Sequence, residues 1–396
     1  MEATLAAELV LPDAIGLLGE AIELRRSLHA QPELGLSLPH TQQLVLEALQ
    51  GLGLQLWTGT PTTWVLALLE GALPGPTTLL RADMDALPMP EDTGLPYASK
   101  VDGVMHACGH DAHVAMLAGA AKLLARHREQ VPGRVIFMFQ PGEEGHGGAK
   151  VMLDEGLLER HGHVDRAFAV HISSVLPSGS IFARGGTLMA SADEFRIVVT
   201  GRGGHASMPH DAIDPMPVAC EIVTSLQAML TRRVPAFDPA VLTIAHISGG
   251  TTFNVIPETV TLEGTARAVT PGTRELVLER LREVAEHIAA AHLCTAEVSK
   301  VLDGYPVTVN DPGEAQKALE TAAKLFGAER SVVMPAPLMG AEDWSYVLAR
   351  VPGCMAFLGA MPPGTERPAP NHSNRFIIDE EAMAAGIAMY AAMGLG

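Results

Sequence analysis

Residues 111–141, DAHVAMLAGAAKLLARHREQVPGRVIFMFQP, contain an apolar helix-like run followed by an apolar strand-like run. The alternation extends in both directions, to strand-like TTLLRADMDAL at 77–87, helix-like GGAKVMLDEGLL at 147–158 and strand-like RAFAVHI at 166–172. Strands that alternate with helices are typical of α/β layers built on a largely parallel sheet. The sequence therefore predicts an α/β fold with a mixed, mostly parallel sheet and helices on both faces.

A different order of elements begins near residue 187. One strand is followed by a helix, two strands, a second helix and a last strand. This β-α-β-β-α-β order defines the ferredoxin-like unit. The length of 396 residues suits two domains, since a domain takes roughly 100 to 200 residues. We therefore expect one domain of residues 1–186 and 305–396 and an inserted α+β domain of residues 187–304.

The balance of charge argues against polyanionic partners. The chain carries 27 Lys and Arg residues against 45 Asp and Glu residues, a formal net charge of -18. Such a surface repels phosphate backbones, so we expect no binding to nucleic acid. Residues 1–26 lack a basic start before an apolar run, and no uninterrupted apolar stretch approaches about 18 residues, so we expect neither a signal peptide nor a membrane span. The four cysteines are too scattered for a disulfide framework, which favours a reducing cytoplasm.

Acidic residues and histidines stand at the carboxyl ends of the predicted strands. They are Asp83, Asp85, Glu143, Glu144 and His171. Open α/β sheets bind ligands at this edge. Carboxylates and imidazoles are common ligands of metal ions, so the sequence predicts a metal site there.

The densest group of ligand-type side chains is HACGHDAH at 106–113. The thiolate of Cys108 and the imidazole of His110 can meet one cation, or bridge two, if the glycine between them permits a sharp bend. The alternative is an ordinary helix start, with Asp111 near its N-terminus and His113 on its surface. We favour a metal site for Cys108 and His110 because other candidate ligands follow at the strand ends.

The adjacent glutamates Glu143 and Glu144 suggest two carboxylates with different roles. In a loop, neighbouring side chains point in different directions, so one carboxylate can ligate a metal while the other transfers protons. An acidic helix N-terminus is the alternative. Asp83 and Asp85 share a face of their strand, and a carboxylate there could orient a ligating imidazole. His372, which precedes the last predicted helix, is a further candidate ligand.

Two other motifs indicate different sites, and both are disfavoured. Residues 201–206, GRGGHA, match the G-x-G-x-x-A dinucleotide fingerprint, and Glu221 lies 20 residues beyond the first glycine. However, prolines interrupt the helix that should follow, and Glu221 falls within a predicted helix. A thiol hydrolase that uses Cys108, His110 and Asp111 is also disfavoured, because triad members normally come from distant segments.

Eight motifs in this order resemble those of the metallo-amidohydrolases of the aminoacylase and hippurate hydrolase type. This family includes the hydrolases of auxin-amino acid conjugates and belongs to the larger group that contains carboxypeptidase G. The resemblance extends over nearly the whole chain. The motifs are RRSLHAQPELG (25–35), LRADMDALP (80–88), HACGHDAHVAMLAGAA (106–121), FQPGEEGHGGA (139–149), GRGGHASMPHDAIDP (201–215), TTFNVIPETVTLEGTAR (251–267), GAEDWSYVL (340–348) and NHSNRFIIDEE (371–381).

The resemblance implies a role for each candidate residue. It implies that Cys108 bridges two metal ions, that Glu143 is the catalytic base, and that Asp85 supports a metal-binding imidazole. The remaining metal ligands implied are His110, Glu144, His171 and His372. The inserted domain resembles the family's lid, which commonly mediates dimerisation. The lid residues implied to face the substrate are His205, Asn254 and Arg267.

The predicted function is metal-dependent hydrolysis of the amide bond of N-acyl amino acids, which releases a carboxylic acid and a free amino acid. Two divalent cations per subunit would activate water and stabilise the oxyanion, while Glu143 moves the proton. Zn, Mn, Co and Ni all suit the mixed ligand set. The alternatives are a dipeptidase or carboxypeptidase with the same dinuclear site, or a binding module without catalysis. We expect a cytoplasmic homodimer or homotetramer that acts on small molecules.

Overall fold

The computed structural model describes residues 2–160 and 162–396, so residues 1 and 161 of the predicted first domain lie outside the described residues. The chain forms two compact units. Unit 1 comprises Met1–Leu188, Val309–Ala336 and Tyr346–Gly396, and unit 2 comprises Met189–Thr308 and Pro337–Ser345. The domain limits expected from the sequence, 187 and 304, stay predictions.

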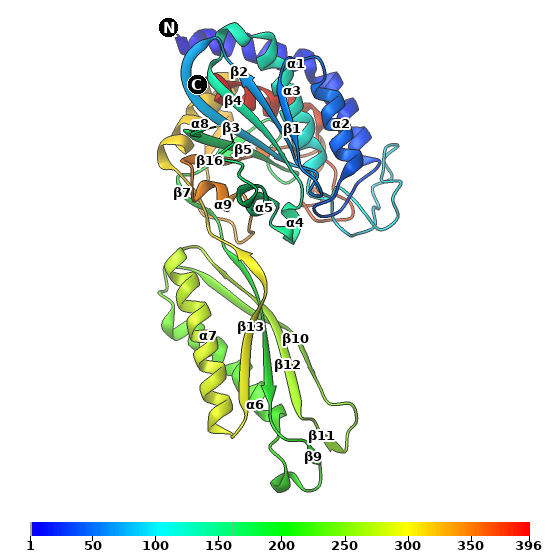
Figure 1. The fold of residues 1–396 in the computed structure, drawn as a ribbon, viewed down its shortest axis with the longest axis vertical. Helices are drawn as coiled ribbons and strands as arrows, with labels where there is room; N and C mark the ends of the chain where they lie inside the picture. The colour runs from blue at the N-terminus through cyan, green and yellow to red at the C-terminus, as the bar shows by residue number, and fades with distance from the viewer. Residues whose placement is uncertain (1, 161) are drawn as a thin grey trace. The chain divides into compact units, whose positions relative to one another are not determined.

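Unit 1 contains an eight-stranded mixed sheet. In sheet order, its strands are β1 (Gln55–Thr58), β2 (Val65–Glu70), β4 (Pro132–Gln140), β3 (Leu73–Asp83), β5 (Arg166–Ser173), β16 (Gly353–Gly359), β6 (Ile181–Ala183) and β15 (Ser331–Val333) (Figure 1). The central strands β4, β3, β5 and β16 pair in parallel, whereas β1 with β2, β2 with β4, and β16 with β6 are antiparallel. The predicted α/β fold with a mixed, mostly parallel sheet is confirmed.

The helices of unit 1 bury the apolar strands of the sheet. They are α1 (Glu2–His29), α2 (Pro39–Leu49), α3 (His110–Arg126), α4 (Glu143–His146), α5 (Gly148–Asp154), α8 (Pro312–Phe326) and α10 (Met383–Leu395). Helices α1, α3 and α10 contact one another, and α3 and α10 also contact β3. The packing is close, because a Cβ added at Gly119 of α3 would come within 2.9 Å of Ile387 of α10. Three further elements, β7 (Gly186–Met189), β14 (Thr308–Asn310) and α9 (Ser345–Leu348), contain residues of both units.

Unit 2 is an α+β unit with a four-stranded antiparallel sheet. Its elements along the chain are β8 (Ala192–Thr200), β9 (Gly204–His205), α6 (Pro215–Arg233), β10 (Ala240–Gly249), β11 (Val255–Ile256), β12 (Thr259–Ala268), α7 (Pro271–Ala291) and β13 (Thr295–Tyr305). The sheet order is β10-β12-β8-β13, and β9 pairs separately with β11. Helices α6 and α7 contact each other and lie along one face of the sheet (Figure 1). The expected β-α-β-β-α-β order is confirmed, and the role of a lid stays a prediction.

Both helices of unit 2 begin at a side-chain cap that is followed by proline. Asp214 accepts the backbone N–H of Met216 before α6, and Thr270 accepts that of Thr273 before α7. Such caps satisfy N–H groups that have no partner within a helix, and proline suits the first helical position. Neither these helices nor any other in the described parts of the chain is long and apolar enough to cross a membrane.

A buried ionic group joins helix α1 to the start of α3. Arg25 Nε donates to Asp111 Oδ2 at 3.0 Å, and His29 Nδ1 donates to the same oxygen at 2.8 Å. On its other side, His29 Nε2 lies 3.3 Å from Glu91 Oε1. Asp111 and His29 are fully buried, and a buried charge is stable only when it is paired. Asp111 therefore anchors the N-terminal helix.

Replacing His29 with Gln is expected to change how stability depends on pH. Burial alone would lower the pKa of His29, but Asp111 and Glu91 raise it from 6.5 to about 9. Because the folded pKa lies above the unfolded one, the protonated ring stabilises the fold fully below pH 6.5, and this contribution is lost as the pH rises through about 9. The shift corresponds to about 3 kcal/mol.

Urea denaturation of wild type and His29→Gln between about pH 6 and 10 measures this contribution. We expect the difference in unfolding free energy to be larger by about 3 kcal/mol at the acidic end. His163→Gln, which alters an imidazole with 84% exposure, is the control and should change little at any pH. A wild-type advantage that does not vary with pH would rule out a protonated His29.

Candidate metal centre

Three adjacent parallel strands bring the candidate ligands to one edge of the unit 1 sheet. β3 ends at Asp83, β4 ends at Gln140 just before the two glutamates, and β5 carries His171. Three overlapping groups form there, and in each the ligand atoms lie within 4.8 Å of one another. The groups are Cys108-His110-His171, Cys108-Glu144-His372 and His110-Glu143-Glu144. The structure thus brings together all five predicted ligands and Glu143.

A left-handed glycine separates the two ligand-type residues of the HACGH motif. Gly109 has a φ of 88°, and a Cβ added there would clash with Cγ2 of Ile172. Glycine is the residue that adopts this conformation without strain. Because of the bend at Gly109, Cys108 lies just before helix α3 and His110 is its first residue. This is the sharp bend that the side chains of Cys108 and His110 need in order to meet one cation.

Backbone carbonyls fix which nitrogen each candidate imidazole presents. His110 Nδ1 donates to the carbonyl of Asp85 at 2.8 Å, and His171 Nδ1 donates to the carbonyl of Ile172 at 2.8 Å. A carbonyl only accepts hydrogen bonds, so Nδ1 carries the proton and Nε2 keeps its lone pair when the ring is neutral. Nε2 of His171 lies 3.4 Å from Cys108 Sγ. Neutral rings of His110 and His171 therefore turn the lone pair of Nε2 toward the cluster.

His113 and Asp83 form a fourth group with His110, but their atoms are engaged elsewhere. His113 Nδ1 donates to Asp83 Oδ1 at 2.5 Å, and its Nε2 accepts the backbone N–H of Ile172 at 2.7 Å. Arg81 Nη1 donates to Asp83 Oδ2 at 2.6 Å. Burial alone would raise the pKa of Asp83, yet Arg81 holds it well below its usual range. Both nitrogens of His113 are thus engaged and cannot bind a cation, and the negative charge of Asp83 is already paired with Arg81.

The carboxylate of Asp85 holds the two glutamates by their backbone. Its Oδ1 accepts the N–H of Glu143 at 2.8 Å, and its Oδ2 accepts the N–H of Glu144 at 3.0 Å. The same carboxylate lies 3.7 Å from Nδ1 of His110, beyond hydrogen-bond distance, and the carbonyl of Asp85 takes that proton instead. The supporting role predicted for the Asp85 side chain stays a prediction, and its observed bonds fix the glutamate loop.

Glu144 and His372 complete the cluster, although they are remote from each other in the sequence. Glu144 Oε1 lies 3.2 Å from His372 Nε2 and 4.0 Å from His110 Nε2. His372 is the most accessible of these residues, with its side chain 54% exposed. Its backbone N–H donates to the carbonyl of Ala107 at 2.8 Å. The C-terminal segment is thereby fixed to the residue that precedes Cys108.

The ionisable groups of the centre shift one another's pKa. Burial raises the pKa of the Cys108 thiol, and the carboxylate of Glu144 raises it further. Hydrogen bonds to Cys108 and Glu144 raise the pKa of His372 to about 10. Burial opposes the charged form of Glu144, but His372 lowers its pKa. The thiol and the carboxylate thus favour a positively charged partner, and a metal ion is such a partner because it displaces protons from its ligands.

The donor set fits divalent transition-metal ions. His110 Nε2 is buried and makes no hydrogen bond within residues 2–160 and 162–396. A buried polar atom without a partner is costly unless something else satisfies it. Sulfur, imidazole nitrogen and carboxylate oxygen together are ligands for Zn and related ions.

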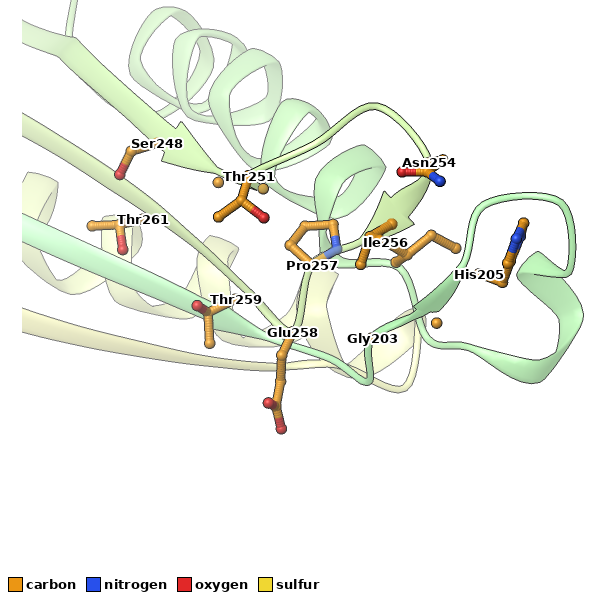
Figure 2. Close-up of a pocket in the computed structure, with 14 residues that line it drawn as sticks. Gly203, His205, Ser248, Thr251, Asn254, Ile256, Pro257, Glu258, Thr259 and Thr261 are labelled. Carbon is orange, nitrogen blue, oxygen red and sulfur yellow. The ribbon is translucent and has the colours of Figure 1, made fainter.

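The three predicted substrate residues all belong to unit 2. His205 and Asn254 line an open pocket of about 820 Å³ (Figure 2). Nδ1 of His205 accepts the backbone N–H of Ser207 at 3.1 Å, so Nε2 is the donor when the ring is neutral. Arg267 lies on β12 and donates to the carbonyl of Met339 at 3.1 Å, and it is not among the described residues that line the pocket. Two of the three are thus brought together.

Sequence reasoning missed several residues that support the cluster. Arg81 Nε donates to Gln140 Oε1 at 2.8 Å, and the Tyr390 hydroxyl donates to the carbonyl of Arg81 at 2.6 Å. Asn371, which contacts the backbone of two ligand-bearing segments, was also missed. In the alternative to a metal site the sequence predicts His113 on a helix surface, whereas this histidine is fully buried. A polar residue inside an otherwise apolar run, such as Arg81 in TTLLRAD, was the available signal.

Three comparisons relate the chain to known proteins. The model of "Peptidase family M20/M25/M40" matches residues 79–395. "Thermostable carboxypeptidase 1" of Saccharolobus solfataricus is 39% identical over 378 residues, which cover 94% of this chain and 94% of that protein. "IAA-amino acid hydrolase ILR1-like 2" of Arabidopsis thaliana is 39% identical, covering 94% of this chain and 84% of that protein. "N-acetylcysteine deacetylase" of Bacillus subtilis is 38% identical, covering 94% and 96%.

Two solved structures are similar over almost the full length. One is a putative aminohydrolase from methicillin-resistant Staphylococcus aureus, with a TM-score of 0.91, 31% identity and coverage of 98% of both chains. The other is the YXEP protein of Bacillus subtilis, described as a dinuclear metal binding peptidase from the M20 family. Its TM-score is 0.82 at 35% identity, and the match covers 96% of this chain and 98% of that one.

Proposed function

Because the chain belongs to peptidase family M20/M25/M40, we propose that it hydrolyses the amide bond of N-acyl amino acids and releases a carboxylic acid and a free amino acid. The predicted family and the predicted class of enzyme, an amidohydrolase, are confirmed by the comparisons. The observation that carries the proposal is the cluster of three overlapping Cys, His and Glu groups, in each of which the ligand atoms lie within 4.8 Å of one another. An unstrained amide is a poor electrophile, so its hydrolysis needs such a site.

We propose a pair of divalent cations per subunit as the cofactor. Cys108 belongs to two ligand groups, one with His110 and His171 and one with Glu144 and His372, so its sulfur would help to hold both cations. The description of the YXEP protein as a dinuclear metal binding peptidase supports this proposal. When bound, such cations polarise a carbonyl group and lower the pKa of a water molecule.

Glu143 is the residue that we propose for proton transfer. The residue is 6% exposed, and its backbone N–H is fixed by Asp85. The carboxylate would accept a proton from the attacking water and deliver it to the departing amine. A buried carboxylate suits this role because the surrounding protein keeps bulk water from competing for the proton.

A carboxypeptidase or dipeptidase is the second candidate, because one relative with 39% identity is named a carboxypeptidase. Purified protein supplied with Zn, Mn, Co or Ni should be assayed with hippurate, N-acetyl amino acids and dipeptides, with release of free amine as the signal. We expect kcat/KM to be at least about 10-fold higher for the N-acyl substrates. Preference for dipeptides would favour the second candidate. Metal binding without any hydrolysis would instead indicate a binding module.

We keep the proposal that His205, Asn254 and Arg267 of unit 2 bind the substrate. A substrate carboxylate or a developing oxyanion needs a hydrogen-bond donor, and Nε2–H of His205 is one. Assembly into a homodimer or homotetramer and a cytoplasmic location stay predictions.

Replacing His205 with Ala is expected to lower kcat by roughly 10²-fold, because the variant loses a donor that strengthens its bond in the transition state. Metal content and thermal stability should be unchanged, since the His205 side chain is exposed and its described hydrogen bonds are to Ser207 of the same loop. His210→Ala is the matched control: its side chain is 73% exposed and does not line the pocket. Full activity of His205→Ala would remove this residue from the substrate site.

A further inference from the structure

The side chain of Asn371 makes three hydrogen bonds to main-chain groups of the metal-bearing segments. Its Nδ2 donates to the carbonyl of Cys108 at 3.0 Å and to the carbonyl of Ile172 at 3.0 Å. Its Oδ1 accepts the backbone N–H of Ser174 at 3.4 Å. Two acceptors opposite Nδ2 and one donor opposite Oδ1 allow only one orientation of the amide. The side chain therefore uses both of its donor hydrogens and its acceptor.

These bonds join three stretches of chain that each carry a candidate ligand. Cys108 is itself a ligand, Ile172 follows His171, and Asn371 precedes His372. The first two segments contribute to the Cys108-His110-His171 group and the third completes the Cys108-Glu144-His372 group. The amide of Asn371 thus fixes the distances between the backbone segments that carry Cys108, His171 and His372.

His372 needs such an anchor because its own backbone is in an unfavourable conformation. Its φ is 69°, in the left-handed region that residues other than glycine seldom adopt. The N–H of His372 donates to the carbonyl of Ala107 at 2.8 Å, one residue from the carbonyl that Asn371 holds. Without Asn371, the bond to Ala107 and the turn closed by the N–H of Ser373 and the carbonyl of Pro370 would have to keep His372 in this conformation and its imidazole beside Glu144.

We propose that Asn371 is a positioning residue of the metal centre, which sets the separation of Cys108, His171 and His372 without being a ligand. This inference rests on the proposed metal-dependent function. Partners of this kind, which orient the ligands rather than bind the metal, typically change metal affinity by roughly 10- to 100-fold when they are removed. Asn371→Asp preserves the shape of the side chain but turns a carboxylate oxygen toward two carbonyl oxygens, so it should weaken the centre at least as much as Asn371→Ala.

Unit 1 offers a matched control in Asn310. Its Nδ2 donates to the carbonyls of Arg184 and Met355 at 3.0 and 2.9 Å, and its Oδ1 accepts the N–H of Met355 at 2.8 Å. Asn310 thus makes the same kinds of main-chain hydrogen bond as Asn371, two as donor and one as acceptor. Neither Arg184 nor Met355 is a candidate ligand or the sequence neighbour of one. A substitution there costs hydrogen bonds of the same kind without touching the metal-bearing segments.

The experiment titrates metal-free wild type, Asn371→Asp, Asn371→Ala and Asn310→Asp with Co²⁺. Three quantities are read: the free Co²⁺ concentration at half-saturation, the absorption bands of the Co²⁺ protein including thiolate-to-cobalt charge transfer, and the melting temperature of the metal-free protein. For both Asn371 variants we expect the half-saturating concentration to rise roughly 10- to 100-fold and the bands to change. Asn310→Asp should lower the melting temperature at least as much and leave the affinity and the bands as in wild type.

Several outcomes would overturn the inference. Wild-type affinity and bands in both Asn371 variants would do so, and so would an equal loss of affinity in Asn310→Asp, because general destabilisation would then explain the effect. If an Asp or Ala variant does not fold, Asn371→Ser and Asn310→Ser take their place with the same expectations. If wild type itself binds no Co²⁺, the proposed function fails and this inference fails with it, whereas wild-type binding with unaffected Asn371 variants rejects the inference alone.

Discussion

Replacing Glu143 with Gln is expected to lower the turnover of amide hydrolysis by roughly 10²- to 10⁴-fold while the protein keeps its metal. Gln has nearly the shape of Glu but cannot accept a proton. The loop should keep its conformation, because Asp85 bonds to the backbone N–H of residue 143, which the substitution leaves in place. Turnover at saturating substrate and metal content by elemental analysis measure the two effects separately.

Glu144→Gln is the matched comparison, because it makes the same replacement of a carboxylate by an amide in the neighbouring residue. Glu144 Oε1 lies 3.2 Å from His372 Nε2 and belongs to the group that contains Cys108. This variant should therefore lose metal as well as activity. Metal loss in Glu143→Gln with retention in Glu144→Gln would mean that the two residues have exchanged roles. Undiminished turnover in Glu143→Gln would remove Glu143 from proton transfer altogether.

Replacing Cys108 with Ala is expected to remove bound metal and to abolish hydrolysis. Its sulfur is shared by two of the ligand groups and lies 3.4 Å from Nε2 of His171. No other described side chain supplies a sulfur to these groups, so alanine leaves both of them one ligand short. The measurement is metal content after dialysis, followed by activity after divalent metal is added back.

Cys354→Ala controls for the loss of a buried thiol. Cys354 is fully buried on β16, where its Sγ donates to the carbonyl of Met355 at 3.4 Å. This variant should lose some stability and keep both metal and activity. Dialysis of wild type against a chelator should reproduce the Cys108→Ala phenotype, and divalent metal should reverse it. Full activity in verified metal-free protein would refute a metal-dependent mechanism.

The fold and the location of the site could be predicted because both depend on patterns that are local in sequence. The alternation of apolar runs around 77–172 was enough to predict the mixed α/β sheet, and the comparisons and the structure confirm it. Parallel strands align their carboxyl ends, so residues that follow them had to meet at one edge. Cys108, His110 and Glu144 lie there, and their roles as ligands stay predictions.

The supporting contacts could not be predicted, because each depends on a partner that is remote in sequence. His113 is held by Asp83, 30 residues earlier, and by the N–H of Ile172, 59 residues later. Nothing in HDAH distinguishes this buried histidine from a surface one. The role expected of the Asp85 side chain, which is to support an imidazole, stays a prediction, and the hydrogen bond observed to His110 goes to the Asp85 carbonyl. A sequence pattern places a residue on an element but does not say which of its atoms is used.

The contact between Asn371 and Cys108 also bears on the synthesis of the protein. The two residues are 263 positions apart, so the cluster cannot assemble until nearly the whole chain has left the ribosome. The elements β8 to β13 run continuously along the chain and are complete much earlier, and a domain generally folds as a unit during synthesis. We therefore expect a nascent chain in which β8 to β13 have already folded to lack the Cys108-Glu144-His372 group. A chain that ends before residue 371 would contain these elements but lack Asn371 and His372, so its centre would be incomplete.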